Sequence, residues 1–72
     1  MPLTLTINGQ PREFPALEPS ATVTQLVAAM EFKGDRIAVE LNHEIAQRTQ
    51  WDQLRLQSGD RLEIVHFVGG GS

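Results

Sequence analysis

The residues at the C-terminal end of the sequence, Gly69–Ser72, read Gly-Gly-Gly-Ser and are those best suited to unusual chemistry. They follow the largely apolar run Leu62–Val68 without a polar spacer. Glycine has no Cβ, so a glycine tail can enter channels that exclude other residues. A strand that passes directly into such a tail suggests a protein that offers its own C-terminus as a reactant. The same composition is also typical of a flexible linker or a cloning scar, so the rest of the chain must decide.

Size and composition exclude several classes of function. A length of 72 residues permits one domain without a deep cleft between lobes, which argues against a self-sufficient enzyme. The net charge of −3 disfavours nucleic acid and anionic membranes as partners and suits a basic protein surface. The absence of cysteine excludes a disulfide framework, a thiolate zinc site and a persulfide on the protein itself. We see no signal peptide and no membrane-spanning run, and expect a cytoplasmic protein.

The first half of the sequence predicts a hairpin followed by the only long helix. Leu3–Ile7 alternates apolar and polar residues, as a half-buried strand does, and Asn8-Gly9 is a strong signal for a type I′ turn. The return strand is expected at Arg12–Phe14. Thr22–Gln25 has the pattern of a capping box. It predicts a helix over Val23–Phe32.

The helix is expected to bury one face. Val23, Leu26, Val27 and Met30 are spaced so that they form a single apolar stripe. Gly34 is the expected residue just beyond the helix end.

The second half predicts short strands and turns. Ile37–Leu41 alternates, Asn42-His43 resembles a turn, and Glu44–Ala46 is a short return strand. Thr49–Asp52 is expected to form one helical turn and Leu54–Leu56 a brief strand, with a turn at residues 58–60. The final strand, over residues 62–68, is apolar on both faces at its far end, which indicates a central position in the sheet.

This element order predicts an α+β fold of the β-grasp type, as in ubiquitin: a mixed sheet with one main helix on one face. A ferredoxin-like fold would need a second full helix, for which residues 48–59 are too short. The first and last strands are expected to be adjacent and parallel. We expect the domain to span residues 1–68 and the tail residues 69–72.

Side chains outside the tail are candidates for docking and not for catalysis. Val65 and Phe67 are expected on the open face of the sheet, where exposed apolar groups would form a docking patch. Trp51 suits either the core or a docking surface, and Arg48 suits either solvent or a partner carboxylate. His43 and His66 have no further ligands at metal-binding spacing, so they are assigned to a turn and to the strand surface. No metal site, nucleophile motif or phosphate-binding loop is recognised.

At this point the residues resemble a known family. Val65–Gly71 is similar to the C-terminus of ThiS, the sulfur carrier family of thiamine biosynthesis. Asn42–Ile45 and Arg48–Trp51, where Arg precedes an aromatic residue by three positions, resemble that family's middle segment, and Ser58–Asp60 also fits. The resemblance covers most of the chain and is strongest from Asn42 onward.

The resemblance implies a protein co-substrate and not an enzyme. An ATP-dependent ThiS adenylyltransferase would convert the Gly71 carboxylate to an acyl-adenylate, and sulfur from a donor persulfide would replace AMP. The resulting thiocarboxylate would supply sulfur to thiazole synthase. The carrier would bind no cofactor, because ATP is consumed by the activating partner. Its tail, with Gly69 and Gly70, would carry the reactive group roughly 10–14 Å beyond the body, and Val65, Phe67, Arg48 and Trp51 would serve docking.

Two alternatives stay open at this stage. The small subunit of molybdopterin synthase uses the same tail chemistry, and a plain ubiquitin-like interaction module with a linker or tag tail would never be adenylated. The family pattern ends at Gly70-Gly71, so the additional Ser72 departs from it. We expect the active form to end at Gly71 and Ser72 to be a precursor or cloning-derived residue.

Overall fold

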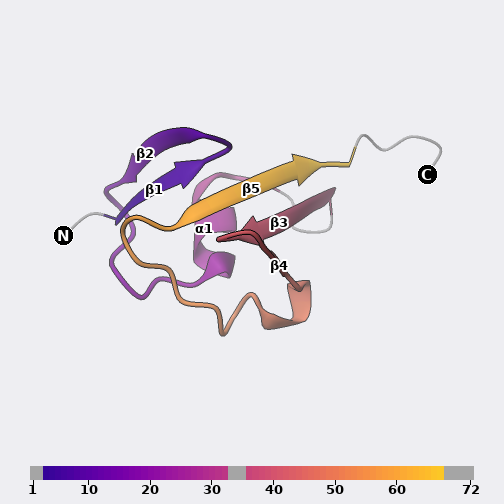
Figure 1. Ribbon diagram of the computed structural model, residues 1–72. Helices are drawn as coiled ribbons and strands as arrows, with labels where there is room; N and C mark the ends of the chain where they lie inside the picture. The colour runs from indigo at the N-terminus through magenta and orange to yellow at the C-terminus, as the bar shows by residue number, and fades with distance from the viewer. Residues whose placement is uncertain (1–2, 33–35, 68–72) are drawn as a thin grey trace.

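The computed structural model, which describes residues 3–32 and 36–67, places a five-stranded sheet against a single helix in the described part of the chain (Figure 1). The strand order is β2-β1-β5-β3-β4. The strands are β1 (Leu3–Ile7), β2 (Gln10–Phe14), β3 (Ile37–Leu41), β4 (Glu44–Ala46) and β5 (Arg61–His66). β1 and β5 pair in parallel and the other neighbours are antiparallel. This mixed sheet with one helix is the predicted β-grasp fold.

Both hairpins turn through residues with positive φ, as type I′ turns require. Asn8 and Gly9 have φ of 51° and 84°, and Asn42 and His43 have φ of 50° and 72°. The predicted turns are therefore confirmed. β2 begins earlier than expected, at Gln10, and includes Pro11. It is an edge strand, and an edge tolerates the missing N–H of proline.

Helix α1 (Val23–Ala29) begins with the predicted capping box. The Gln25 backbone N–H donates to the Thr22 hydroxyl at 3.2 Å, and the Thr22 N–H donates to the Gln25 side chain at 2.8 Å. The helix is shorter than the predicted Val23–Phe32, because Glu31 adopts a left-handed φ of 61° that cannot continue it. Gly34, the expected C-cap, lies outside the described residues.

The core lies between α1 and one face of the sheet. Leu26 is fully buried and the apolar stripe of the helix faces inward, as predicted, although Met30 is only partly buried. The buried apolar residues are Leu3, Leu5, Ile7, Phe14, Leu17, Ala21, Val23, Leu26, Val27, Ile37, Val39, Ala46, Trp51, Leu56, Leu62 and Ile64. Members from every strand and from the helix form one cluster, which holds the two layers together.

The segment between β4 and β5 departs most from expectation. The single helical turn is a 3-10 helix, η2 (Arg48–Gln50), one residue earlier than predicted. The predicted strand Leu54–Leu56 is wrong, since only an isolated bridge joins Thr22 to Arg55. Leu56 nevertheless is fully buried, so its apolar character reflects core packing and not a strand. β5 ends at His66, and Val68, the predicted last residue of that strand, lies outside the described residues.

Within the described residues, no helix has the length and apolarity needed to cross a membrane.

Replacing Leu26 by Ala should lower the free energy of unfolding by about 2–5 kcal/mol, because it opens a cavity at a fully buried position. Ile45→Ala is the matched control. The Ile45 side chain is 74% exposed, so its truncation should change the free energy by less than about 0.5 kcal/mol. Urea denaturation measures both values. Equal losses in the two variants would contradict the assignment of α1 to the core.

Candidate functional site

The predicted reactive tail, Gly69–Ser72, and the predicted domain boundary after Val68 lie outside the described residues. The described part of the site is β5, which leads toward this tail (Figure 1). β5 lies in the middle of the sheet between β1 and β3, as the sequence predicted. Its register with β3 runs over five residue pairs, from Leu41 opposite Leu62 to Ile37 opposite His66. A strand hydrogen-bonded on both sides is a rigid support for whatever follows it.

The Asn8 side chain extends the support of β5 beyond the end of β1. The backbone ladder between β1 and β5 contains only two paired positions, Thr6 with Arg61 and Ile7 with Leu62. Beyond them, the Asn8 side-chain amide donates to the Ile64 carbonyl at 3.1 Å, and its oxygen accepts from the Ile64 N–H at 2.7 Å. The side chain thus provides the two hydrogen bonds that a further strand residue would have made. The tip of the first hairpin thereby holds the second half of β5.

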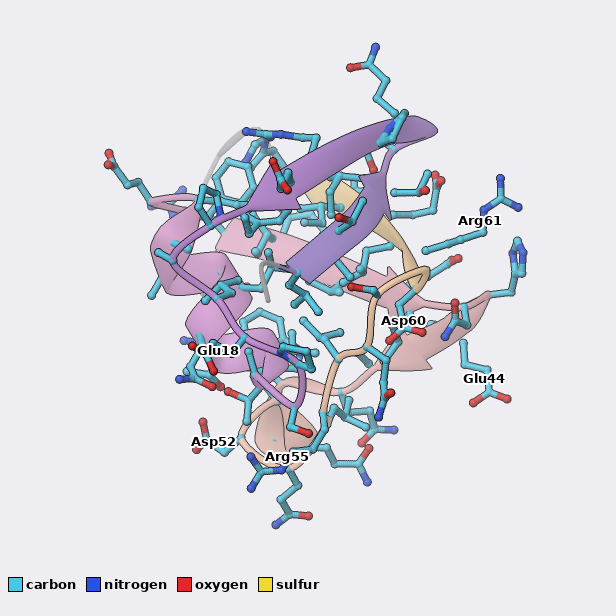
Figure 2. All side chains as sticks on the ribbon, turned by 90° about the vertical axis from the view of Figure 1, so that its left-hand side faces the viewer. Glu18, Glu44, Asp52, Arg55, Asp60 and Arg61 are labelled. Carbon is cyan, nitrogen blue, oxygen red and sulfur yellow. The ribbon has the colours of Figure 1, made fainter. Side chains whose placement is uncertain are left out.

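A second asparagine, at the tip of the other hairpin, holds the beginning of β5. The Asn42 oxygen accepts from the Arg61 N–H at 2.9 Å, and the Asn42 amide donates to the Asp60 carboxylate at 3.1 Å. Asp60 also accepts from the Gln57 N–H at 2.9 Å. Figure 2 shows the labelled Asp60 beside the chain segment that enters β5. The first residue of the strand and its second half are therefore fixed by side chains from the two hairpin turns.

The C-terminal end of β5 and the residue after it contact the segments just before β3 and just after α1. The Phe67 N–H donates to the Arg36 carbonyl at 2.8 Å. The His66 ring lies edge-on to Phe32, with 4.5 Å between centroids. His66 is exposed on the strand and His43 lies in a turn, the positions expected of them. The described residues contain no cluster of ligands that could hold a metal ion.

An apolar patch lies on the face of the sheet opposite α1. Val65 and Phe67 are each 57% exposed, as the sequence predicted. Ile45 of β4 is 74% exposed and was not identified from the sequence. A shallow hollow of about 130 Å³ is lined by Ala38, Val39, Glu40, Ile45, Glu63 and Val65. We call Ile45, Val65 and Phe67 the open-face patch. One signal could have identified Ile45. Side chains alternate between the two faces of a strand, so an inward-facing Ala46 in the predicted strand Glu44–Ala46 places Ile45 on the outer face.

Trp51 and Arg48 do not join this patch. Trp51 is only 5% exposed, and its indole N–H donates to the Ala46 carbonyl at 2.8 Å. Its assignment to a docking surface is corrected: Trp51 is a core residue that ties the loop after β4 to the sheet. Arg48 is exposed and lines a separate hollow of about 340 Å³ beside α1, together with Trp51 and Asp52.

The sequence and the fold of this chain are both similar to those of known proteins. The model of the ThiS family matches residues 5–71, which is nearly the whole chain. The chain belongs to the ThiS family. The sulfur carrier protein ThiS of Bacillus subtilis is 33% identical over 67 residues, which cover 93% of this chain and 98% of that protein. The crystal structure of the thiamine biosynthesis protein ThiS from Geobacter metallireducens superimposes with a TM-score of 0.81 at 36% identity, covering 96% of this chain and all of the other.

Longer proteins contain a segment similar to this ThiS-family chain. A thiazole synthase from Paramagnetospirillum magneticum is 43% identical over 68 residues, which cover 94% of this chain. A thiazole synthase from Magnetococcus marinus is 34% identical over 65 residues. The chain spans only about a fifth of the length of these two relatives, 20% and 19%.

The Asn8 contact predicts a specific loss of protection in β5. Asn8→Gly keeps the positive φ of the turn but removes both hydrogen bonds, so the Ile64 amide should exchange hydrogen much faster. Stability should fall by about 1–3 kcal/mol, since two polar backbone groups lose their partners. Asn8→Asp retains the acceptor and should preserve more of the Ile64 protection. Hydrogen exchange followed by NMR measures both, and unchanged protection of Ile64 in Asn8→Gly would refute the role of this side chain.

Proposed function

We propose that this chain is a sulfur carrier for the thiazole half of thiamine, with Gly71 as the residue that carries the sulfur. The observation behind the proposal is that the central strand of a ThiS-family fold, anchored at both ends, leads toward a Gly-Gly-Gly sequence. β5 ends beside the first residue of β3, at one edge of the described domain (Figure 1). A narrow tail on a rigid support suits a group that must react inside another protein.

The chemistry needs little from the carrier itself. A carboxylate is a poor electrophile, so the Gly71 carboxylate attacks the α-phosphate of ATP and releases pyrophosphate, which leaves an acyl-adenylate. The outer sulfur of a donor persulfide then displaces AMP to give an acyl disulfide, and a thiol cleaves its S–S bond, which releases the thiocarboxylate and leaves a disulfide between that thiol and the donor. These steps take place in the active site of the activating partner, which excludes water from the adenylate. The carrier is therefore a co-substrate and not an enzyme, and it binds no cofactor of its own.

The partners in this proposal are an ATP-dependent ThiS adenylyltransferase, a persulfide sulfur donor and thiazole synthase. Two relatives named thiazole synthase contain a segment like this chain, which supports a connection with that enzyme. The carrier would meet these partners in the cytoplasm. We favour the thiamine pathway over molybdopterin synthesis, because the matching family and the carrier of Bacillus subtilis are ThiS proteins. The same likeness disfavours a plain interaction module.

Docking is assigned to the open-face patch. Phe67→Glu should leave the fold intact, because the ring is 57% exposed, but should weaken binding to the activating enzyme and to thiazole synthase. An aromatic anchor buried in an interface typically contributes about 2 kcal/mol or more, or a roughly thirtyfold change in Kd. Gln10→Glu, which adds the same charge to the exposed edge strand β2, is the control. Calorimetry measures the affinities. Equal affinities of the two variants for both enzymes would remove Phe67 from the interface.

The reactive residue is tested by intact-protein mass spectrometry. With activating enzyme, ATP and a sulfur donor, a chain that ends at Gly71 should gain the mass difference between sulfur and oxygen. A chain that ends at Ser72 should not, because its Gly71 carboxyl group is locked in an amide. A chain that ends at Gly70 tests whether the position of the terminus matters. Efficient formation of a thiocarboxylate on Ser72 would overturn the assignment of Gly71.

A further inference from the structure

Two glutamates face each other across the middle of the open sheet face. Glu40 of β3 and Glu63 of β5 are directly paired in the antiparallel register. Both are exposed, and they alternate with buried neighbours, so both point away from the core. Opposite side chains in such a pair have Cβ atoms about 4.5–5.5 Å apart, and like charges at this distance destabilise a sheet. The fold gains nothing from placing two carboxylates here.

Apolar groups surround the two carboxylates. Ile45 lies opposite Glu40 on β4, so the row across three strands is Ile45, Glu40 and Glu63. The next outward-facing row is Ala38 opposite Val65. These residues, together with Val39, line the hollow of about 130 Å³ described above, whose surface is almost entirely apolar.

We propose that this hollow receives a lysine or arginine side chain from a protein partner that docks on the open-face patch. The aliphatic stem would cover Ile45, Ala38 and Val65, while the cation would lie between Glu40 and Glu63. Long basic side chains have this division between an apolar stem and a charged head. The inference rests on the proposed function, since the partner is the activating enzyme or thiazole synthase.

Charge complementarity distinguishes this occupant from a second copy of the chain. Other charged residues on the same face are Glu13 on β2, Arg61 on β5 and, by continuation of the β3–β5 register, Arg36 opposite Phe67, and none of them lines the hollow. Two copies stacked through this face would bring two acidic pairs together. A cation from a partner instead relieves the repulsion that Glu40 and Glu63 exert on each other in the free carrier. The patch also lies on β5, the strand that leads toward the tail, so docking there brings the tail to the partner.

The experiment compares the wild-type chain, the double variant Glu40→Gln/Glu63→Gln and the control Glu13→Gln. Affinities for the activating enzyme and for thiazole synthase are measured by calorimetry at about 0.1 M and about 1 M NaCl, where charges are screened within about 10 Å and 3 Å. The double variant should bind at least one enzyme about tenfold more weakly at low salt, with much less salt dependence than the wild type. Glu13→Gln should bind as the wild type does. The Tm of the double variant should equal or exceed that of the wild type, because repulsion is relieved.

Each other outcome has a distinct meaning. If the wild type binds and the double variant binds equally tightly with the same salt dependence, the inference fails while the proposed function stands. Equal weakening by Glu13→Gln also overturns it, because the effect would then be one of net charge. If the wild type binds neither enzyme and forms no thiocarboxylate, the proposed function fails and the inference falls with it. A lower Tm in the double variant would show that the carboxylates stabilise the fold, which contradicts their assignment to a partner.

Discussion

The position of β5 between β1 and β3 is the constraint on which the rest of the molecule depends. A terminal strand at the edge of a sheet frays readily, since chain ends are among the least stable parts of a domain. Parallel pairing with β1 moves this strand to the centre, but that pairing requires the chain between the two strands to cross over the sheet. The chain makes this crossing through α1 and through the segment before β5, in which Trp51 and Leu56 are buried. Leu26, Trp51 and Leu56 of these segments belong to the same buried cluster as Leu62 and Ile64 of β5, so the crossing chain packs against the last strand.

The two hairpins contribute to the same arrangement in a way that the strands alone do not. Each turn places an asparagine at positive φ, and each asparagine uses its side chain to bind the β5 backbone, at Ile64 and at Arg61. Asparagine therefore meets two requirements at each position: it tolerates the left-handed conformation, and its side-chain amide can hydrogen-bond to the strand. Glycine would satisfy the turn but not the strand. This double use explains how a sheet with so short a parallel ladder can hold its central strand.

Much of the fold could be predicted because it depends on local patterns. The alternation of Leu3–Ile7, the capping box at Thr22 and the two type I′ turns each specify their own structure. The features that were missed depend on tertiary contacts. The contact between Asn8 and Ile64 joins residues 56 positions apart, which no local pattern indicates. The sequence left Trp51 open between the core and a docking surface, because its burial depends on a loop that returns to the sheet. Leu54–Leu56 has the alternation of a strand but fills the core beneath the helix. The left-handed turn at Glu31 replaced the last helical residues, although glutamate is not a typical residue for that conformation.

The open face of the sheet contains residues that do not favour the stability of the free domain. A domain of this size is marginally stable, yet it leaves Ile45, Val65 and Phe67 in solvent and sets Glu40 against Glu63. The relatives contain such a domain in two settings. In two thiazole synthases the matching segment belongs to a longer chain, and covalent linkage can raise the local concentration of the domain. The sulfur carrier of Bacillus subtilis is matched over 98% of its length, so nearly all of it corresponds to this domain. In the docking that we propose, the apolar groups and the Glu40–Glu63 pair of this face supply affinity, and their cost to the free domain is offset only in the complex.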